Sequence, residues 1–119
     1  MHALDLDALR KPEIRFWTAR CREELAGCAA LKELDPCHAE IKSMRTTAAH
    51  RGKGVATKLL HHLIAEARTC QYSSLSLETG SMTAFQAART FYEKSGFVYC
   101  APFADYVRDP NSVFMTLKI

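Results

Sequence analysis

The pattern of hydrophobic and polar residues changes its period near the middle of the chain. In the first half, short apolar and aromatic runs alternate with polar turns, which predicts strands over residues 13–20, 24–34 and 39–47. Gly27 inside the second of these predicts a bulge or a close backbone approach. We interpret the leucine-containing segment 3–10 as a short helix. The N-terminal part is therefore expected to be a short helix followed by an antiparallel meander.

Beyond residue 50 the apolar positions recur at helical spacing before strand-like alternation returns. The elements expected there are, in order, a helix over residues 54–70, a strand over 73–79, a helix over 83–96, a strand over 97–103, a polar loop over 104–111 and a strand over 112–119. The strand–helix–strand passage across residues 39–79 predicts a right-handed crossover between parallel strands. We therefore expect a single α/β (α+β) domain, residues 1–119, around a mixed sheet.

Composition narrows the class of function. The chain has 119 residues and a net charge of +3, without the dense Lys/Arg clusters of a nucleic-acid-binding domain. No apolar stretch is long enough to cross a membrane, and the acidic N-terminus does not resemble a signal peptide. The five cysteines match no metal or redox spacing, which favours reduced thiols and a cytoplasmic location. The mild positive charge would suit a small anionic ligand, with no nucleic-acid or membrane partner.

A glycine-rich, cationic segment precedes the predicted long helix. Gly52 and Gly54 alternate with Arg51 and Lys53. A helix N-terminus offers unpaired N–H groups and a positive dipole end, so it attracts phosphate, and glycines allow close approach. A Walker A loop is excluded because Gly54 stands where Ser or Thr is needed, and a dinucleotide fingerprint because Thr57 replaces its third glycine. A plain turn with solvated cations remains the alternative for this segment alone.

Three further segments give the loop a context. Arg51, Gly54 and Ala56 form the pattern R-x-x-G-x-A within the segment "MRTTAAHRGKGVATKLLHHLIAEA". The segments "LSLETG" and "ARTFYEKSGFV" follow it along the chain. In the last of them, Tyr92 stands four residues before a Gly-Phe pair. In this order, over residues 39–119, they resemble the GNAT family of acetyl-coenzyme A-dependent N-acetyltransferases, and a small bacterial subgroup with undefined substrates. The resemblance implies a mostly antiparallel sheet with a central parallel pair and flanking helices.

The resemblance also implies a site for acetyl-coenzyme A as co-substrate. Backbone amides of the loop would hold its pyrophosphate; they belong to Arg51, Gly52, Lys53, Gly54, Val55 and Ala56. The preceding strand would bind the pantetheine arm through its main chain at Met44, Arg45 and Thr46, in a slot opened by a bulge, with the amide of Met44 or a neighbour as oxyanion donor. No metal is expected, since the adjacent His61 and His62 point in different directions on a helix.

Acetyl transfer to an amine needs a base for the amine and an acid for the leaving thiolate. By resemblance Tyr92 is the general acid; from its helix position alone it would be a core aromatic. Glu40 and Glu78, near the ends of neighbouring predicted strands, are alternative bases, directly or through water. His50 is a further candidate base, but as a loop histidine beside Arg51 it is expected to be exposed. The loop over residues 104–111, with its mixed charges, is a candidate wall of the acceptor pocket.

The start of the chain departs from the family pattern. The first strand and helix of the family fold are not recognisable, so the chain reads as N-terminally truncated. Strand 13–20 would then be an exposed sheet edge, and we expect a homodimer to cover it. Phe85 stands where many relatives carry a coenzyme-contacting Asn. Two functions follow: acetyl transfer to a small-molecule amine or, alternatively, a non-catalytic coenzyme A-binding or interaction module that has lost its acceptor site.

Overall fold

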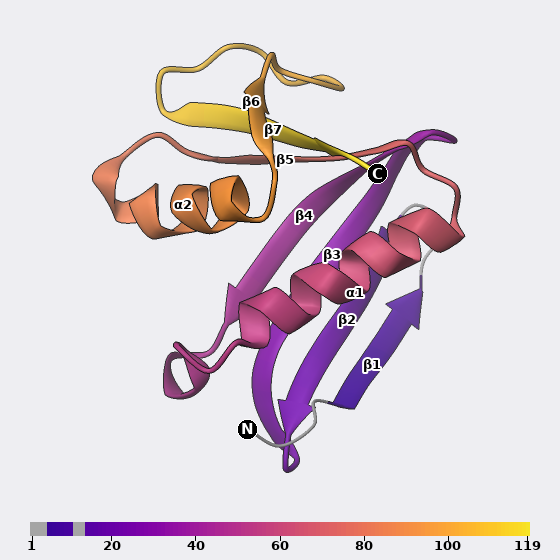
Figure 1. Cartoon of the computed structure of the whole chain (residues 1–119), viewed down its shortest axis with the longest axis vertical. Coiled ribbons are helices and arrows are strands. Elements are labelled where there is room, and N and C mark those ends of the chain that lie inside the picture. The colour runs from indigo at the N-terminus through magenta and orange to yellow at the C-terminus, as the bar shows by residue number, and fades with distance from the viewer. Residues whose placement is uncertain (1–4, 11–13) are drawn as a thin grey trace.

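The protein is built on a seven-stranded sheet with the strand order β1-β2-β3-β4-β5-β7-β6 (Figure 1). The computed structural model describes the backbone of residues 5–10 and the backbone and side chains of residues 14–119. The elements are β1 (Asp5–Arg10), β2 (Ile14–Cys21), β3 (Glu24–Asp35), β4 (His38–Thr46), α1 (Val55–Thr69), β5 (Ser74–Gly80), α2 (Gln86–Lys94), β6 (Val98–Cys100) and β7 (Ser112–Lys118), with 3-10 turns at Ala48–His50 and Thr83–Phe85. β4 and β5 are parallel and the other neighbours antiparallel, which confirms the expected mixed sheet.

The expected N-terminal helix is wrong for the described part of its range. Residues 5–10 form β1, which pairs with β2 in antiparallel register from Asp5 opposite Arg20 to Arg10 opposite Arg15. From Asp5 to Ala8 the sequence alternates acidic and apolar residues, a period of two that suits a strand. Residues 3 and 4 of the expected helix, and residue 13 of the next strand, lie outside the described residues.

β2 is therefore an inner strand, and the expected exposed edge at residues 13–20 is wrong because β1 lies along it. The homodimer was expected in order to cover this strand. That argument no longer applies, since β1 of the same chain supplies the hydrogen-bonding partner. Dimer formation remains an untested prediction.

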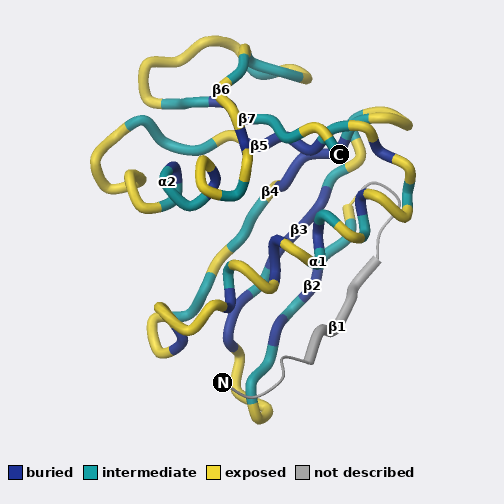
Figure 2. Tube along the Cα trace, viewed as in Figure 1, coloured by how far each residue is buried: buried dark blue, intermediate teal, exposed yellow. Residues whose placement is uncertain are grey.

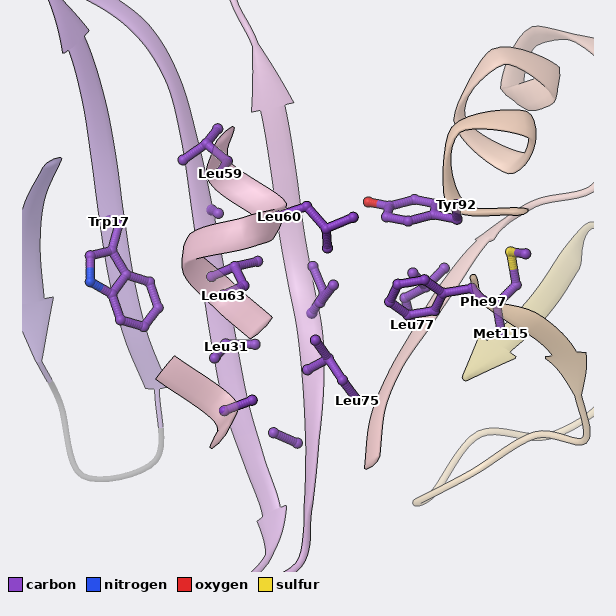
Figure 3. Packing of buried hydrophobic residues seen from close by; sticks show 14 of the residues in the cluster. Trp17, Leu31, Leu59, Leu60, Leu63, Leu75, Leu77, Tyr92, Phe97 and Met115 are labelled. Carbon is purple, nitrogen blue, oxygen red and sulfur yellow. The ribbon is translucent and has the colours of Figure 1, made fainter. Parts of the chain in front are cut away.

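One face of the sheet, called the front face here, is covered by α1. Val55, Leu59 and Leu63 form a buried stripe on the helix, and Leu31 of β3 belongs to the same core cluster (Figures 2 and 3). Burying one such side chain contributes about 1.5–3 kcal/mol, so this stripe fixes the helix on the sheet. The opposite face, called the back face, is partly covered by the loop between β6 and β7, whose Phe103 packs on Phe114 of β7 with ring centroids 5.7 Å apart.

Gly27 lies at the closest approach between α1 and the sheet. The β2–β3 register shifts beside it, so the predicted bulge is confirmed. A Cβ atom at Gly27 would lie 2.5 Å from the carbonyl oxygen of Arg45, 3.1 Å from Leu59 and 3.2 Å from Val55. The predicted close backbone approach is therefore confirmed too, and only glycine fits between β4 and the start of α1.

A second bulge lies in β4. Ala30 pairs with Ser43 but Leu31 pairs with Ile41, so Lys42 is the extra residue. The parallel pairing of β4 with β5 ends at the same point, at Ile41 opposite Leu77. Figure 1 shows the two strands separating beyond it, with α2 beside the open end. The sheet is thus split at its centre, and β4 continues beyond Ile41 paired with β3 alone.

The other side of the split is made by β5, β7, β6 and α2. Arg89 of α2 is buried and donates to the carbonyl oxygens of Gly80 at 2.6 Å and Met82 at 2.9 Å. These bonds fasten α2 to the end of β5. β6 is shorter than the expected strand over residues 97–103, and Pro102, which has no N–H to donate to a ladder, lies just beyond its end.

The contact at Gly27 gives a stability prediction. Gly27→Ala should lower the free energy of unfolding by about 1–3 kcal/mol, because the added methyl group meets a backbone carbonyl that cannot move without parting β4 from β3. Chemical denaturation measures the change. Cys28→Ala, at the next and less buried position of β3, is the control and should have a clearly smaller effect. A Gly27→Ala protein as stable as the parent would contradict the prediction.

Candidate active site

An open hollow of about 600 Å³ lies at the split between β4 and β5. Its walls are the end of β4, the turn and glycine loop after it, the first turn of α1, and α2. The volume is in the range of ligand-binding clefts. Every residue that the sequence predicted to contact the coenzyme lines this hollow, apart from Lys53. In the structure, the end of β4 and the glycine loop, which the sequence predicted to bind the coenzyme, thus line the same hollow.

The glycine loop makes an uncapped helix start. Gly52 and Gly54 have φ values of +75° and +79°, a conformation that favours glycine. Gly54 is the N-cap residue of α1; no side chain caps the first amides, and the first turn contains no acidic residue. The positive end of the helix is therefore not neutralised locally and faces the hollow. The amide of Arg51 was expected to bind pyrophosphate together with the others. In the structure it already donates a hydrogen bond to the carbonyl oxygen of Ala48, at 3.4 Å, within the preceding turn.

His50 is buried, with 6% of its surface exposed, so the expectation of an exposed loop histidine is wrong. Its Nδ1 lies 3.0 Å from the hydroxyl of Thr47 and 3.8 Å from the carboxylate of Glu24. The 3-10 turn between β4 and the glycine loop folds the imidazole inward, where the ring also lines the hollow.

Tyr92 belongs both to the core and to the hollow. Its ring packs edge-on against Phe91 and Phe97, with centroids 5.3 and 5.4 Å apart. Figure 3 shows the phenol oxygen pointing toward Leu60 of α1, across the split. Burial raises the pKa of Tyr92 to about 12, because the phenolate would lose its hydration. The phenol therefore keeps its proton at neutral pH.

Glu40 lies on the back face, opposite the hollow. Its side chain is only 3% exposed, and Oε2 accepts a hydrogen bond from the Tyr106 hydroxyl at 2.6 Å. The Lys42 ammonium lies 3.8 Å from the same carboxylate oxygen and 3.2 Å from the Tyr106 hydroxyl. The β4 bulge thus places a lysine beside a buried carboxylate at the point where the strands part.

Glu78, the other predicted base, lies on β5 on the far side of the split. It is exposed and accepts a hydrogen bond from Ser112 at 2.6 Å. Burial, the hydrogen bond to Glu40 and the charges of Glu40 and Glu78 all raise the pKa of Tyr106. The two carboxylates therefore both act on one phenol of the β6–β7 loop, whereas Arg108 of that loop lines a different hollow.

Sequence reasoning missed part of the wall. Thr57 of α1 and Ala87, Ala88 and Phe91 of α2 also line the hollow. The i, i+4 spacing of Ala88 and Tyr92 was the available signal, since such residues share one helix face. No cluster of three or more metal-ligating side chains occurs within residues 14–119. No helix in the described part of the chain is long and apolar enough to span a bilayer.

Comparisons with known proteins agree with this arrangement. Residues 1–97 match the model of the acetyltransferase (GNAT) family. An uncharacterized N-acetyltransferase of Bacillus subtilis (strain 168) is 62% identical over 119 residues, which cover 100% of this chain and 79% of that protein.

Solved structures share the fold. A putative acyl-CoA N-acyltransferase from Klebsiella pneumoniae superposes with a TM-score of 0.83 at 32% identity, over 92% of this chain and 75% of that one. A GNAT-family acetyltransferase from Elizabethkingia anophelis, solved with acetyl-CoA bound, has a TM-score of 0.78 at 19% identity, over 90% and 77% of the two chains. The family match, the close relative and the split sheet with its glycine loop lead to one conclusion: this chain belongs to the GNAT family of acetyltransferases.

Proposed function

We propose that the protein transfers the acetyl group of acetyl-coenzyme A to an amine of a small molecule. The observation that carries this proposal is the hollow that joins an uncapped helix N-terminus at one end to the Tyr92 phenol at the other, along the split between β4 and β5. The bound acetyl-CoA of the Elizabethkingia structure supports the choice of co-substrate, because that protein shares this fold.

The pyrophosphate fits the start of α1. The N–H groups of the first helical turn lack carbonyl partners one turn earlier, and here no side chain takes their place. Positive φ at Gly52 and Gly54 turns the loop backbone without a Cβ in the way, and a Cβ at Gly52 would meet nothing within 4 Å. In this proposal the amides from Gly52 to Ala56 bind the phosphate oxygens, and Arg51 contributes charge through its side chain.

The pantetheine arm fits the split. β4 beyond Ile41 pairs with β3 only, so its other edge is available to an amide-bearing chain at Met44, Arg45 and Thr46. An extended arm can add to such an edge as a further strand would. A main-chain N–H of this edge, that of Met44 or a neighbour, would then stabilise the tetrahedral oxyanion.

The reaction needs two proton transfers, and the groups proposed for them lie on opposite faces of the sheet. Glu40, from the back face, accepts the proton that the amine loses as its nitrogen bonds to the acyl carbon; a bridging water would extend its reach. Tyr92, from the front face, donates its proton to the sulfur as the C–S bond breaks, and solvent restores it. Glu40 is a better candidate than Glu78, because it is buried beside the point where the strands part and Glu78 is exposed. A cytoplasmic location remains a prediction, as does dimer formation.

Gly54→Ala should weaken coenzyme A binding by about 10-fold or more, because a Cβ at φ +79° distorts the amides that face the hollow. Calorimetric titration with coenzyme A measures the loss. Gly96→Ala is the matched control: its φ is +101°, so it carries similar backbone strain of about 1–2 kcal/mol, but it lies at the end of α2 away from the loop. Equal binding losses in both variants would contradict a specific role for the loop.

Tyr92→Phe should lower kcat by about 100-fold while coenzyme A binding changes little, because the phenol acts on the leaving sulfur. Release of free thiol with a panel of amines measures turnover. Since the pKa of Tyr92 is raised to about 12, the acid form persists below that pH, and the variant should lose rate equally from pH 6 to pH 10. A variant with unchanged kcat would exclude Tyr92 as the acid. Coenzyme binding without turnover in the parent protein would favour the non-catalytic module.

Glu40→Gln should lower kcat/KM by about 100-fold at neutral pH, with partial recovery at high pH where the amine is already deprotonated. The substitution keeps an oxygen to accept the Tyr106 hydroxyl, so the loop should stay in place. Glu78→Gln is the matched control and should retain most activity. The opposite ranking of the two variants would transfer the role of base to Glu78.

A further inference from the structure

A second hollow, of about 260 Å³, lies on the back face at the point where β4 leaves β5. Lys32, Leu34, Glu40, Lys42, Asp105 and Tyr106 line it. The geometry points to this hollow as the acceptor site, and to an acceptor that carries a carboxylate next to its amine, that is, a small amino acid. This inference rests on the proposed function and names its substrate class.

The buried group in this hollow is an anion. Glu40 is 3% exposed, and a carboxylate removed from water needs compensating partners. The contacts nearby are a neutral phenol at 2.6 Å and a lysine whose nitrogen is 3.8 Å away, beyond hydrogen-bonding distance. An ammonium group that displaces the Tyr106 hydroxyl would supply a full charge-assisted hydrogen bond. The floor of the hollow is therefore suited to the amine of the acceptor.

Two cations lie around this anion. Lys32 is directly opposite Glu40 in the β3–β4 register, so their side chains share the back face. Lys42 is the bulge residue, and 39% of its side chain is exposed. Both lysines are less buried than Glu40, so they lie at the rim of the hollow. With the amine of the acceptor bound to Glu40, the carboxylate of the same acceptor molecule would lie near these lysines. Asp105 adds an exposed carboxylate to the lining, so the two lysines leave the rim with a net positive charge above the buried Glu40. An anion on the floor and a net positive rim complement the ammonium and carboxylate of an amino acid.

The size of the hollow sets a limit on the acceptor. At about 260 Å³ it is smaller than typical drug-binding clefts, and its apolar walls are Leu34 and Ala104. An adjoining hollow shares Lys32, Leu34, Ala104 and Asp105 with it and leaves room for a side chain. The pair therefore has room for the polar end and the side chain of one amino acid.

The position of the hollow fits the reaction. Glu40 immediately precedes Ile41, the last residue of β4 that pairs with β5, and the coenzyme hollow lies along the same strand just beyond it. The bound ammonium first loses one proton to solvent by way of Glu40. The amine nitrogen then attacks the acyl carbon through the split; the N–C bond forms and the C–S bond breaks. The second proton of the amine goes to Glu40 and the sulfur takes the proton of Tyr92; solvent then removes the proton from Glu40 and restores that of Tyr92, so the products are an N-acetyl amino acid and the free thiol.

The test compares amino acids with amines that lack the carboxylate. Alanine and leucine are paired with ethylamine and isopentylamine, and with alanine and leucine methyl esters, in the free-thiol assay. We expect kcat/KM to be about 10-fold or more higher for each amino acid than for its partners, as the loss of one charged contact would cause. In Lys42→Met this preference ratio should fall about 10-fold. Lys118→Met, which removes an exposed lysine of β7, is the control and should leave the ratio unchanged.

The outcomes separate this inference from the proposed function. Turnover of the simple amines and esters as fast as of the amino acids would overturn the acceptor class and leave acetyl transfer intact. A Lys42→Met protein with an unchanged ratio would overturn it too. If coenzyme A binds but no acceptor is turned over, the proposed function fails, and calorimetry with alanine and leucine in the presence of coenzyme A decides the inference by itself. Binding that Lys42→Met weakens supports it, and absence of binding overturns it.

Discussion

The structure depends on one interruption of hydrogen bonding at the centre of the sheet. β4 and β5 pair only as far as Ile41 and Leu77, and the bulge at Lys42 turns β4 away from its neighbour. A sheet that loses its central pairing must recover the free energy elsewhere, and here β4 keeps its pairing with β3 while α1 and α2 pack beside the split. The hollow proposed for the coenzyme and the hollow proposed for the acceptor both lie at this interruption, on opposite faces.

Two contacts hold the sides of the split in place. Gly27 lets the backbone of β4 and the first turns of α1 come together, which aims the uncapped helix start into the hollow. Arg89 binds the end of β5 and so fixes α2, which carries Tyr92. Neither residue is assigned a role with substrate. Both set the distance between the start of α1 and the Tyr92 phenol, and the proposed binding of a long, extended coenzyme requires that distance to be constant.

Local sequence was sufficient to predict much of this protein. Short apolar and aromatic runs between polar turns predicted β2, β3 and β4, the return of strand-like alternation predicted β5 and β7, and helical spacing predicted α1 and α2, because each pattern reflects which side chains are buried. The presence of Gly27 in an apolar strand predicted that another part of the backbone approaches the strand closely there, since a glycine inside a strand often marks such a contact. The segment 5–10 was misread because its alternation spans only Asp5 to Ala8, which is too short to establish a period by itself. Its pairing with β2 decides its conformation.

The sequence by itself determined the groups to which the proposed chemistry is assigned. These are the glycines before α1, whose positive φ no other residue adopts so readily, and Tyr92, whose place on α2 follows from helix periodicity. Only the tertiary structure decided how they meet. Tyr106 reaches Glu40 across 66 residues of chain, and Lys42 joins them because a bulge alters the alternation of β4. Contacts of this kind depend on strand register and loop closure between distant segments, which local patterns of polarity do not encode.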